Sequence, residues 1–147
     1  MDQLPPPLFN PQAADAEARG LLQPTAEDLP SLIAGWSGPR PFRVCSGGTS
    51  SRAAAAGQWT LDLRRTMTGM TWNAADQTVR IGGGCRMGQV LEQLHPLGRT
   101  VSAGLSGWPG VGYVLTGGMG PLSREHGLAV DQLQAIAGVW GSGEPFL

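Results

Sequence analysis

Glycine and proline constrain the fold of this chain more than any other residues. The 147 residues include 23 glycines and 12 prolines, together roughly twice the share found in an average globular protein. Proline interrupts helices and central strands, and glycine weakens both, so we expect short elements joined by many turns. Hydrophobic residues still make up 41% of the chain and charged residues only 14%, which is not the composition of a disordered protein.

The length predicts one domain, since a typical domain has roughly 150 residues. Residues 1–23 contain Pro5-Pro6-Pro7 and lack a periodic apolar face, which predicts a mobile leader. We therefore expect a single folded domain over residues 24–147, with no chemistry in the leader.

Charge and cysteine content exclude several classes of function. Ten arginines, no lysine and eleven acidic residues give a net charge of −1, so we expect no general attraction to nucleic acid or to an anionic membrane. The most apolar long window, residues 101–122, holds seven glycines and two prolines and does not resemble a membrane span. The N-terminus lacks a secretory pattern, and Cys45 and Cys85 fit neither a disulfide framework nor a metal site. These features predict a cytoplasmic protein without a metal.

Apolar spacing predicts two helices and one isolated helical turn. The first is capped by Asp28 and ends at Gly38-Pro39, with Leu29, Leu32, Ile33 and Trp36 on one face. The second carries Met87, Val90, Leu91 and Leu94 and ends at residues 95–98. The isolated turn is expected over residues 122–127.

Alternating residues predict short strands, which with the helices indicate an α+β fold. The expected strands are residues 42–45, 59–63, 100–102 and 135–140, and a hairpin of 70–72 with 78–81. The chain stops three residues after a turn at 141–144, so we expect the last strand to lack its return partner. The module is therefore expected to be incomplete at its C-terminus.

A loop of small residues, Ser46 to Ser51, follows the strand at 42–45. Gly47 and Gly48 permit positive φ and close approach, so successive amides can form a nest for an anion; an ordinary tight turn is the alternative. A P-loop needs a lysine, which this chain lacks. The run at 110–115 begins like a dinucleotide fingerprint, but Leu115 stands at the third glycine position.

No catalytic residue can be named from the sequence. His95 and His126 are the two histidines, and each is most simply a cation at the end of a helix. No serine stands in a Gly-x-Ser-x-Gly elbow. Both cysteines are expected to be small buried hydrophobes.

Four segments form an ordered pattern along the chain: Arg43 to Ser50, Leu61-Asp62-Leu63, Val79 to Cys85, and the run from Ser102 through Gly117-Gly118-Met119-Gly120 to Asp131. In this order they resemble the FAD-binding domain of the vanillyl-alcohol oxidase or p-cresol methylhydroxylase type, the FAD-linked oxidases that include berberine-bridge-enzyme-like proteins. The resemblance covers about residues 24–145 and makes this chain similar to the N-terminal portion of such a domain.

This resemblance implies which residues hold FAD. The first loop would bind the pyrophosphate through backbone amides, the middle segments would line the pyrophosphate and isoalloxazine, and two later positions would approach the adenosine half. In chain order these residues are Ser46, Gly47, Gly48, Thr49, Ser50 and Ser51; then Ala103, Gly104, Leu105, Ser106, Gly110, Val111, Gly112, Gly117, Gly118, Gly120 and Leu122; then Asp131 and Val139.

The sequence departs from the family pattern at four positions. Thr49 stands where many relatives carry a histidine bonded to flavin, and Ser106 stands where some carry a second, cysteine attachment. A noncovalent FAD is therefore expected. Tyr113 replaces a frequent glycine and either crowds the cofactor or turns outward, and Gln132 replaces a frequent asparagine.

The resemblance implies a flavin-dependent oxidoreductase that passes hydride from an alcohol, amine or sugar-like donor to FAD. The substrate domain of such enzymes has no counterpart here, so the catalytic base is not identified and a separate chain is a candidate source of that half. A noncatalytic binding or assembly module, and a fragment from a truncated reading frame, are the alternatives.

Overall fold

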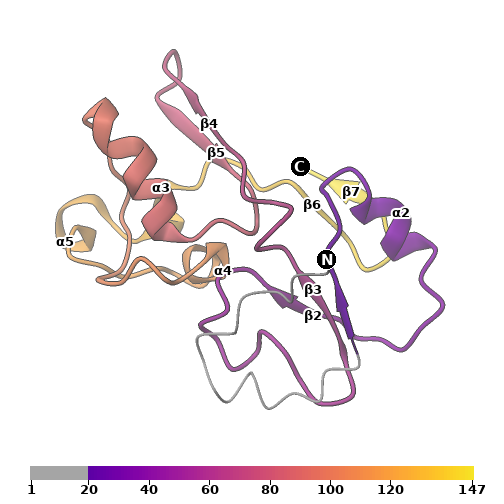
Figure 1. The fold of residues 1–147 in the computed structure, drawn as a ribbon. Helices are drawn as coiled ribbons and strands as arrows, with labels where there is room; N and C mark the ends of the chain where they lie inside the picture. The colour runs from indigo at the N-terminus through magenta and orange to yellow at the C-terminus, as the bar shows by residue number, and fades with distance from the viewer. Residues whose placement is uncertain (1–19) are drawn as a thin grey trace.

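The computed structural model describes residues 20–147, which form short helices and strands linked by long turns (Figure 1). This mixture confirms the α+β class. The elements are β1 (Gly20–Leu22), α2 (Leu29–Ala34), β2 (Arg43–Cys45), β3 (Trp59–Asp62), β4 (Met70–Asn73), β5 (Thr78–Ile81), α3 (Met87–Leu94), η1 (His95–Leu97), α4 (Val111–Leu115), α5 (Ser123–His126), η2 (Ala129–Gln132), β6 (Gly138–Val139) and β7 (Pro145–Phe146).

Three parallel strands form one sheet in the order β1-β3-β2. Leu61 of β3 pairs with Leu22 on one side and with Val44 on the other. Because the strands are parallel, the carboxyl ends of β2 and β3 lie at the same edge. The sequence did not predict β1, which lies in the segment expected to be a leader; residues 1–19 of that leader lie outside the described residues.

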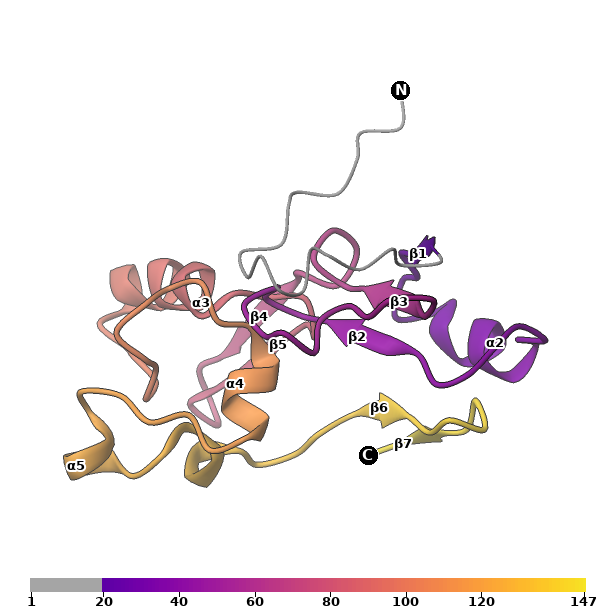
Figure 2. The same ribbon diagram turned by 90° about the horizontal axis from the view of Figure 1, so that it is seen from below.

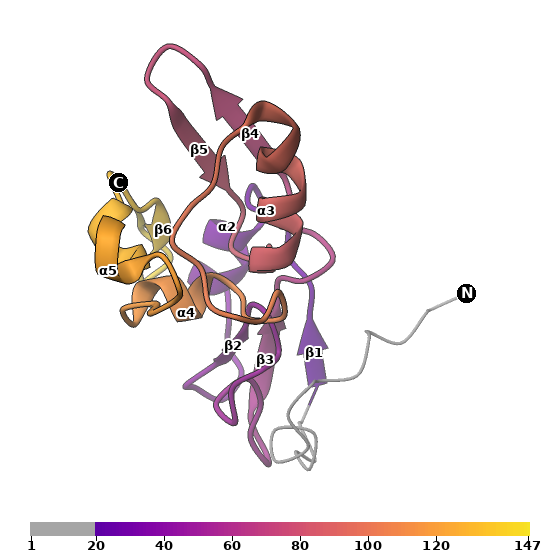
Figure 3. The same ribbon diagram turned by 90° about the vertical axis from the view of Figure 1, so that its left-hand side faces the viewer.

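The predicted hairpin is confirmed as β4 and β5, which pair from Met70↔Ile81 to Asn73↔Thr78. The Asn73 carboxamide accepts the amide of Ala75 at 3.0 Å, and Gln77 takes a φ of 52°, so an Asx turn and a left-handed residue reverse the chain. Figure 3 shows the hairpin beside α3, at the opposite end from the parallel strands.

Helix α2 begins as predicted, with Asp28 as its N-cap residue, but ends earlier than predicted. The Asp28 side chain makes no capping bond to the helix; its carboxylate accepts the Thr25 hydroxyl at 2.6 Å, and its amide donates to that hydroxyl at 3.1 Å. The helix ends at Ala34, before Trp36. Trp36 instead packs its ring 5.2 Å from those of Phe42 and Trp59, and this aromatic contact replaces another helical turn.

The expectation of an unpaired final strand is also wrong. β7 returns to pair with β6, through Gly138↔Phe146 and Val139↔Pro145. β6 is shorter than the strand expected at 135–140, and residues 100–102 pair with no strand of the described structure. Figure 2 shows β6 and β7 running back toward α2, where Arg40 donates to the carbonyls of Ile33 and Gly141.

Two apolar clusters form the main core. The smaller one joins Ile33 of α2 to Leu61 and Leu63, and Val139 of β6 packs against it. The larger one lies under α3, and the hairpin strands pack on it. Its buried members are Cys85, Met87, Val90, Leu94, Ala103, Val114 and Ala129. Across residues 20–147 there is no helix with the length and apolarity to cross a membrane.

Replacing Leu94 with alanine should destabilise the fold by about 2–5 kcal/mol, because Leu94 is 1% exposed in the larger cluster and truncation leaves a cavity. Leu97→Ala is the matched control, since Leu97 is 48% exposed and should cost less than about 1 kcal/mol. Urea unfolding followed by circular dichroism measures both. Equal losses would contradict this placement of the core.

Candidate functional site

The loop Ser46 to Ser51 begins at the carboxyl end of β2. Gly48 takes a φ of 80°, as expected for a glycine that turns the chain. Gly47 and Gly48 are buried, whereas Ser50 and Ser51 are exposed. The Ser50 hydroxyl accepts the amide of Arg52 at 3.1 Å, so the far end of the loop is closed by a local turn.

This loop touches the second glycine segment directly. The Val111 amide donates to Ser46 Oγ at 2.9 Å. A Cβ added at Gly110 would lie 2.3 Å from the Gly47 nitrogen, and a Cβ at Gly47 would lie 2.3 Å from the Gly110 nitrogen. Two glycine backbones therefore meet where no side chain fits, and the expected convergence of the two loops is present.

Segment 107–110 is held from its other side by the start of α3. The Met87 amide donates to the Pro109 carbonyl at 2.8 Å and the Gly88 amide to the Gly107 carbonyl at 2.9 Å. Arg86 forms an isolated antiparallel bridge with Gly110, and its guanidinium carbon lies 4.6 Å from the centre of the Trp108 ring. No sequence motif identified Arg86 or Trp108, since no local pattern joins residues so far apart along the chain.

A second contact brings the middle glycines together around Tyr113. Carbons added at Gly104 and Gly118 would each lie within 3.3 Å of the Tyr113 side chain, and the Tyr113 hydroxyl donates to the Met119 carbonyl. A Cβ at Gly120 would lie 1.7 Å from the Ala103 carbonyl oxygen. Tyr113 thus packs against the 104 and 118–119 segments, whereas the nearest neighbours of Gly47 are backbone atoms of 108–110.

Several of the expected cofactor residues face open space instead of packing against protein. An added Cβ at Gly112 or Gly117 meets nothing within 4 Å. Leu105 is 94% exposed, and Ser106 is exposed as well. These positions leave backbone and an apolar side chain accessible at the surface of the two glycine loops.

Asp131 and Val139 have structural contacts of their own. The Asp131 carboxylate accepts the Leu128 amide at 2.8 Å, beside Gly127 with its φ of 78°. Val139 packs against the cluster of Ile33, Leu61 and Leu63. Asp131 follows Ala129 and Val130, whose amides donate to the carbonyls of Gly118 and Gly117 at 2.9 and 3.0 Å, so its segment adjoins the middle glycines.

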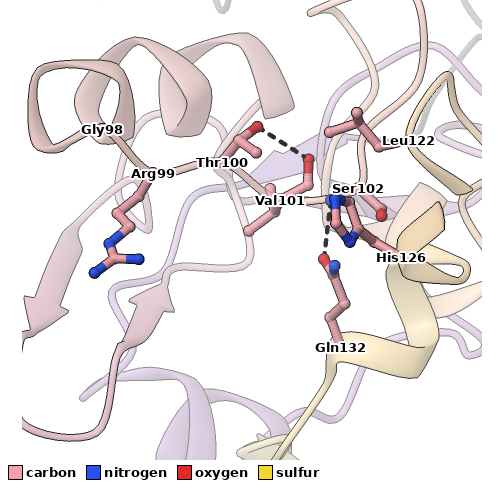
Figure 4. A pocket seen from close by; sticks show the side chains of 8 residues that line it. All are labelled: Gly98, Arg99, Thr100, Val101, Ser102, Leu122, His126 and Gln132. Atoms are coloured by element: carbon pink, nitrogen blue, oxygen red, sulfur yellow. Dashed lines mark hydrogen bonds between the residues drawn. The ribbon is translucent and has the colours of Figure 1, made fainter.

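A pocket of about 280 Å³ lies beside Leu122, one of the expected cofactor residues. Gln132 accepts the Ser102 amide at 2.9 Å, and Figure 4 shows its side chain reaching toward Ser102 and His126. Within residues 20–147, no group bonds the buried Ser102 hydroxyl. No sequence signal identified Ser102 as a pocket residue. The lining is Gly98, Arg99, Thr100, Val101, Ser102, Leu122, His126 and Gln132.

Charge is concentrated at the carboxyl edge of the parallel sheet. Arg64 binds the carboxylate of Asp62 with Nε at 2.8 Å and Nη2 at 2.7 Å, and the two side chains are 4% and 0% exposed.

Burial raises the pKa of the adjacent Cys45 thiol to about 11, while the positive charges of Arg64 and Arg86 act in the opposite direction. Burial also raises the pKa of Cys85. Both thiols are buried, as the sequence predicted.

A family model described as an FAD binding domain matches residues 25–146. The chain belongs to this family. FAD is therefore its cofactor, and the glycine loops described above lie within the matched region. In residues 20–147, no group of three or more histidine, cysteine, aspartate or glutamate side chains is arranged to hold a metal ion.

Solved structures of FAD-linked oxidases share this fold. The 6-hydroxy-D-nicotine oxidase of Arthrobacter nicotinovorans is 27% identical over 90% of this chain and 30% of its own, with a TM-score of 0.81. Glucooligosaccharide oxidase of Acremonium strictum is 28% identical over 86% of this chain and 28% of its own, with a TM-score of 0.78. A variant of berberine bridge enzyme is 20% identical over 95% of this chain and 30% of its own, with a TM-score of 0.85. At this identity, the similarity shows only that the fold is shared.

This chain thus spans about 30% of the length of these solved relatives. No curated protein matches the sequence. The chain is similar to the FAD-binding part of the oxidases, as the order of its glycine motifs predicted.

Gly110→Ala should destabilise the protein by about 1–3 kcal/mol, because its methyl group would overlap the Gly47 backbone. Gly112→Ala is the matched control two residues away: its methyl group enters open space in a helical position that favours alanine over glycine. Thermal melts of both variants without added cofactor measure the difference. An unchanged melting temperature for Gly110→Ala would contradict the loop contact.

Cys45 should make stability fall as pH rises above about 9. The unfolded thiol loses its proton near its ordinary pKa of 9.0, whereas the folded thiol keeps it until about 11, so the unfolded chain binds fewer protons in this window. The stability gap between the wild type and Cys45→Ala should therefore shrink by up to about 3 kcal/mol between pH 8 and pH 11. Urea unfolding across that range tests this, and parallel pH profiles would contradict it.

Proposed function

We propose that this chain is the cofactor-holding part of a flavin-dependent oxidoreductase, and that it binds FAD without a covalent bond. The contact between the Ser46–Ser51 loop and Gly110–Gly112 carries the proposal, because it joins two side-chain-poor segments within the matched FAD-binding region. The small residues at the far end of the loop, Ser50 and Ser51, are exposed, so a dinucleotide can approach the backbone there.

The site fits FAD by its shape and its donors. Amides of residues 46–51 are the proposed donors to the diphosphate, and each bond to a charged oxygen contributes about 1.5–3 kcal/mol. The open faces at Gly112 and Gly117, with Ala103 to Ser106, Gly118, Gly120 and Leu122, are proposed to lie along the ring side. Bound flavin supplies the redox chemistry by accepting a hydride, while these residues hold and orient it.

The missing nucleophiles support noncovalent binding. The similar glucooligosaccharide oxidase is described as carrying a 6-S-cysteinyl, 8α-N1-histidyl FAD. The family pattern places Thr49 and Ser106 at the corresponding positions of this chain. Hydroxyl groups are much weaker nucleophiles than imidazole or thiolate, so we expect the cofactor to be released when the protein is denatured.

The donor is proposed to be an alcohol, amine or sugar-like molecule. The similar enzymes are named as oxidases of 6-hydroxy-D-nicotine and of glucooligosaccharides, which span the amine and sugar classes. We assign the catalytic base to no residue of this chain. Cytoplasmic residence, and a second chain that supplies the substrate half, are further proposals.

An assembly module, the alternative to a cofactor-binding role, would be favoured by an unpaired final strand that could pair with another chain. The structure removes this reason, because β6 and β7 pair with each other. No other described feature favours that module over a cofactor-binding role.

Binding of FAD to the purified chain tests the proposal directly. We expect a yellow protein after gel filtration with FAD, and a colourless protein with free FAD in the supernatant after acid precipitation. Gly112→Ala should keep the melting temperature of the cofactor-free protein but weaken FAD binding at least about tenfold, since its methyl group fills the open face. A colourless wild-type protein with no thermal shift would refute the function, and a yellow acid pellet would refute noncovalent attachment.

A further inference from the structure

Arg86 pairs with the segment that touches the candidate diphosphate loop. It forms an antiparallel bridge with Gly110, and residues opposite each other in such a bridge direct their Cβ atoms to the same side. A Cβ at Gly110 would point at Ser46 Oγ and the Gly47 nitrogen, 2.3 Å from each. The Arg86 side chain therefore leaves the backbone on the side occupied by the Ser46–Ser51 loop.

The guanidinium group is held in place. It lies 4.6 Å from the centre of the Trp108 ring, a cation–π distance. The Arg86 backbone amide donates to the Gln89 side chain at 2.9 Å, and the next amide, of Met87, donates to Pro109. Both ends of the interaction are thus anchored before any ligand arrives, which lowers the entropic cost of using this side chain for binding.

Within the described residues, the positive charge of Arg86 has no carboxylate partner. Among residues 20–147, the ion pairs are Arg64 with Asp62 and His126 with Glu125, so no described carboxylate pairs with Arg86. Its charge acts at the end of β2, where it opposes the burial that raises the pKa of Cys45. The buried arginine at this edge, Arg64, is already matched by Asp62.

We propose that Arg86, positioned by Trp108, is a binding residue for the diphosphate group of the cofactor. The proposal rests on the proposed FAD-binding function and adds a side chain that neither the loop motif nor the family match assigns. Backbone amides in a nest supply hydrogen bonds but no formal charge. A planar guanidinium supplies the counter-charge and paired donors for phosphate oxygens.

The test compares FAD and ADP binding in four proteins: wild type, Arg86→Gln, Arg86→Lys and the control Arg80→Gln. Arg80 lies exposed on β5, so its replacement removes the same charge from the hairpin. We expect Arg86→Gln to weaken both ligands about 10-fold to 100-fold, the effect of one lost charged hydrogen bond. Arg86→Lys should recover part of that loss, and Arg80→Gln should bind like the wild type.

Salt dependence separates a direct ionic contact from a structural role. The affinity of the wild type for ADP should fall as NaCl rises from about 50 to 500 mM, and Arg86→Gln should show a flatter dependence, because screening acts on the lost charge. Thermal melts without ligand verify that the variants fold. If Arg86→Gln does not fold, the binding of FAD and ADP is compared between the wild type and Arg86→Lys.

Two results would overturn the assignment in different ways. If the wild type binds FAD and a folded Arg86 variant binds FAD and ADP as tightly, with the same salt dependence, Arg86 has no such role while the proposed function stands. If the wild type binds neither FAD nor ADP, both the function and the role of Arg86 are refuted.

Discussion

The structure depends on one close approach between two backbones. Gly47 and Gly110 meet so tightly that neither position has room for a Cβ, and the Ser46 hydroxyl accepts the first amide of α4 across the same contact. This meeting joins the carboxyl edge of the parallel sheet to the segment that docks on α3.

Specific polar interactions stabilise the region around this contact. Asp62 and Arg64 form an ion pair with two hydrogen bonds at the end of β3. Removing one partner of a buried pair is strongly destabilising, because the charge that remains is neither paired nor hydrated. Tyr113 joins two glycine segments, at Gly104 and at Gly118–Met119, through its ring and hydroxyl. The glycine-rich region is therefore held by specific contacts, although it contains little regular secondary structure.

Local patterns predicted much of the fold correctly. Helix α3 and the β4–β5 hairpin followed from apolar spacing and turn residues, because each is stabilised mainly by neighbours in sequence. Helix α4 was missed, since its glycine-rich sequence has weak helical propensity. It forms because Val114 is buried in the larger cluster and because Ser46, which is distant in sequence, accepts the Val111 amide.

The sequence by itself determined the class of ligand and the order of the motifs, since glycine loops and their spacing are local properties of the chain. Tertiary structure alone decided which glycines face each other and that β7 returns to pair with β6. It also placed Arg86 over Trp108. These features depend on contacts between residues far apart along the chain. Such contacts form and contribute to stability only once the backbone has folded.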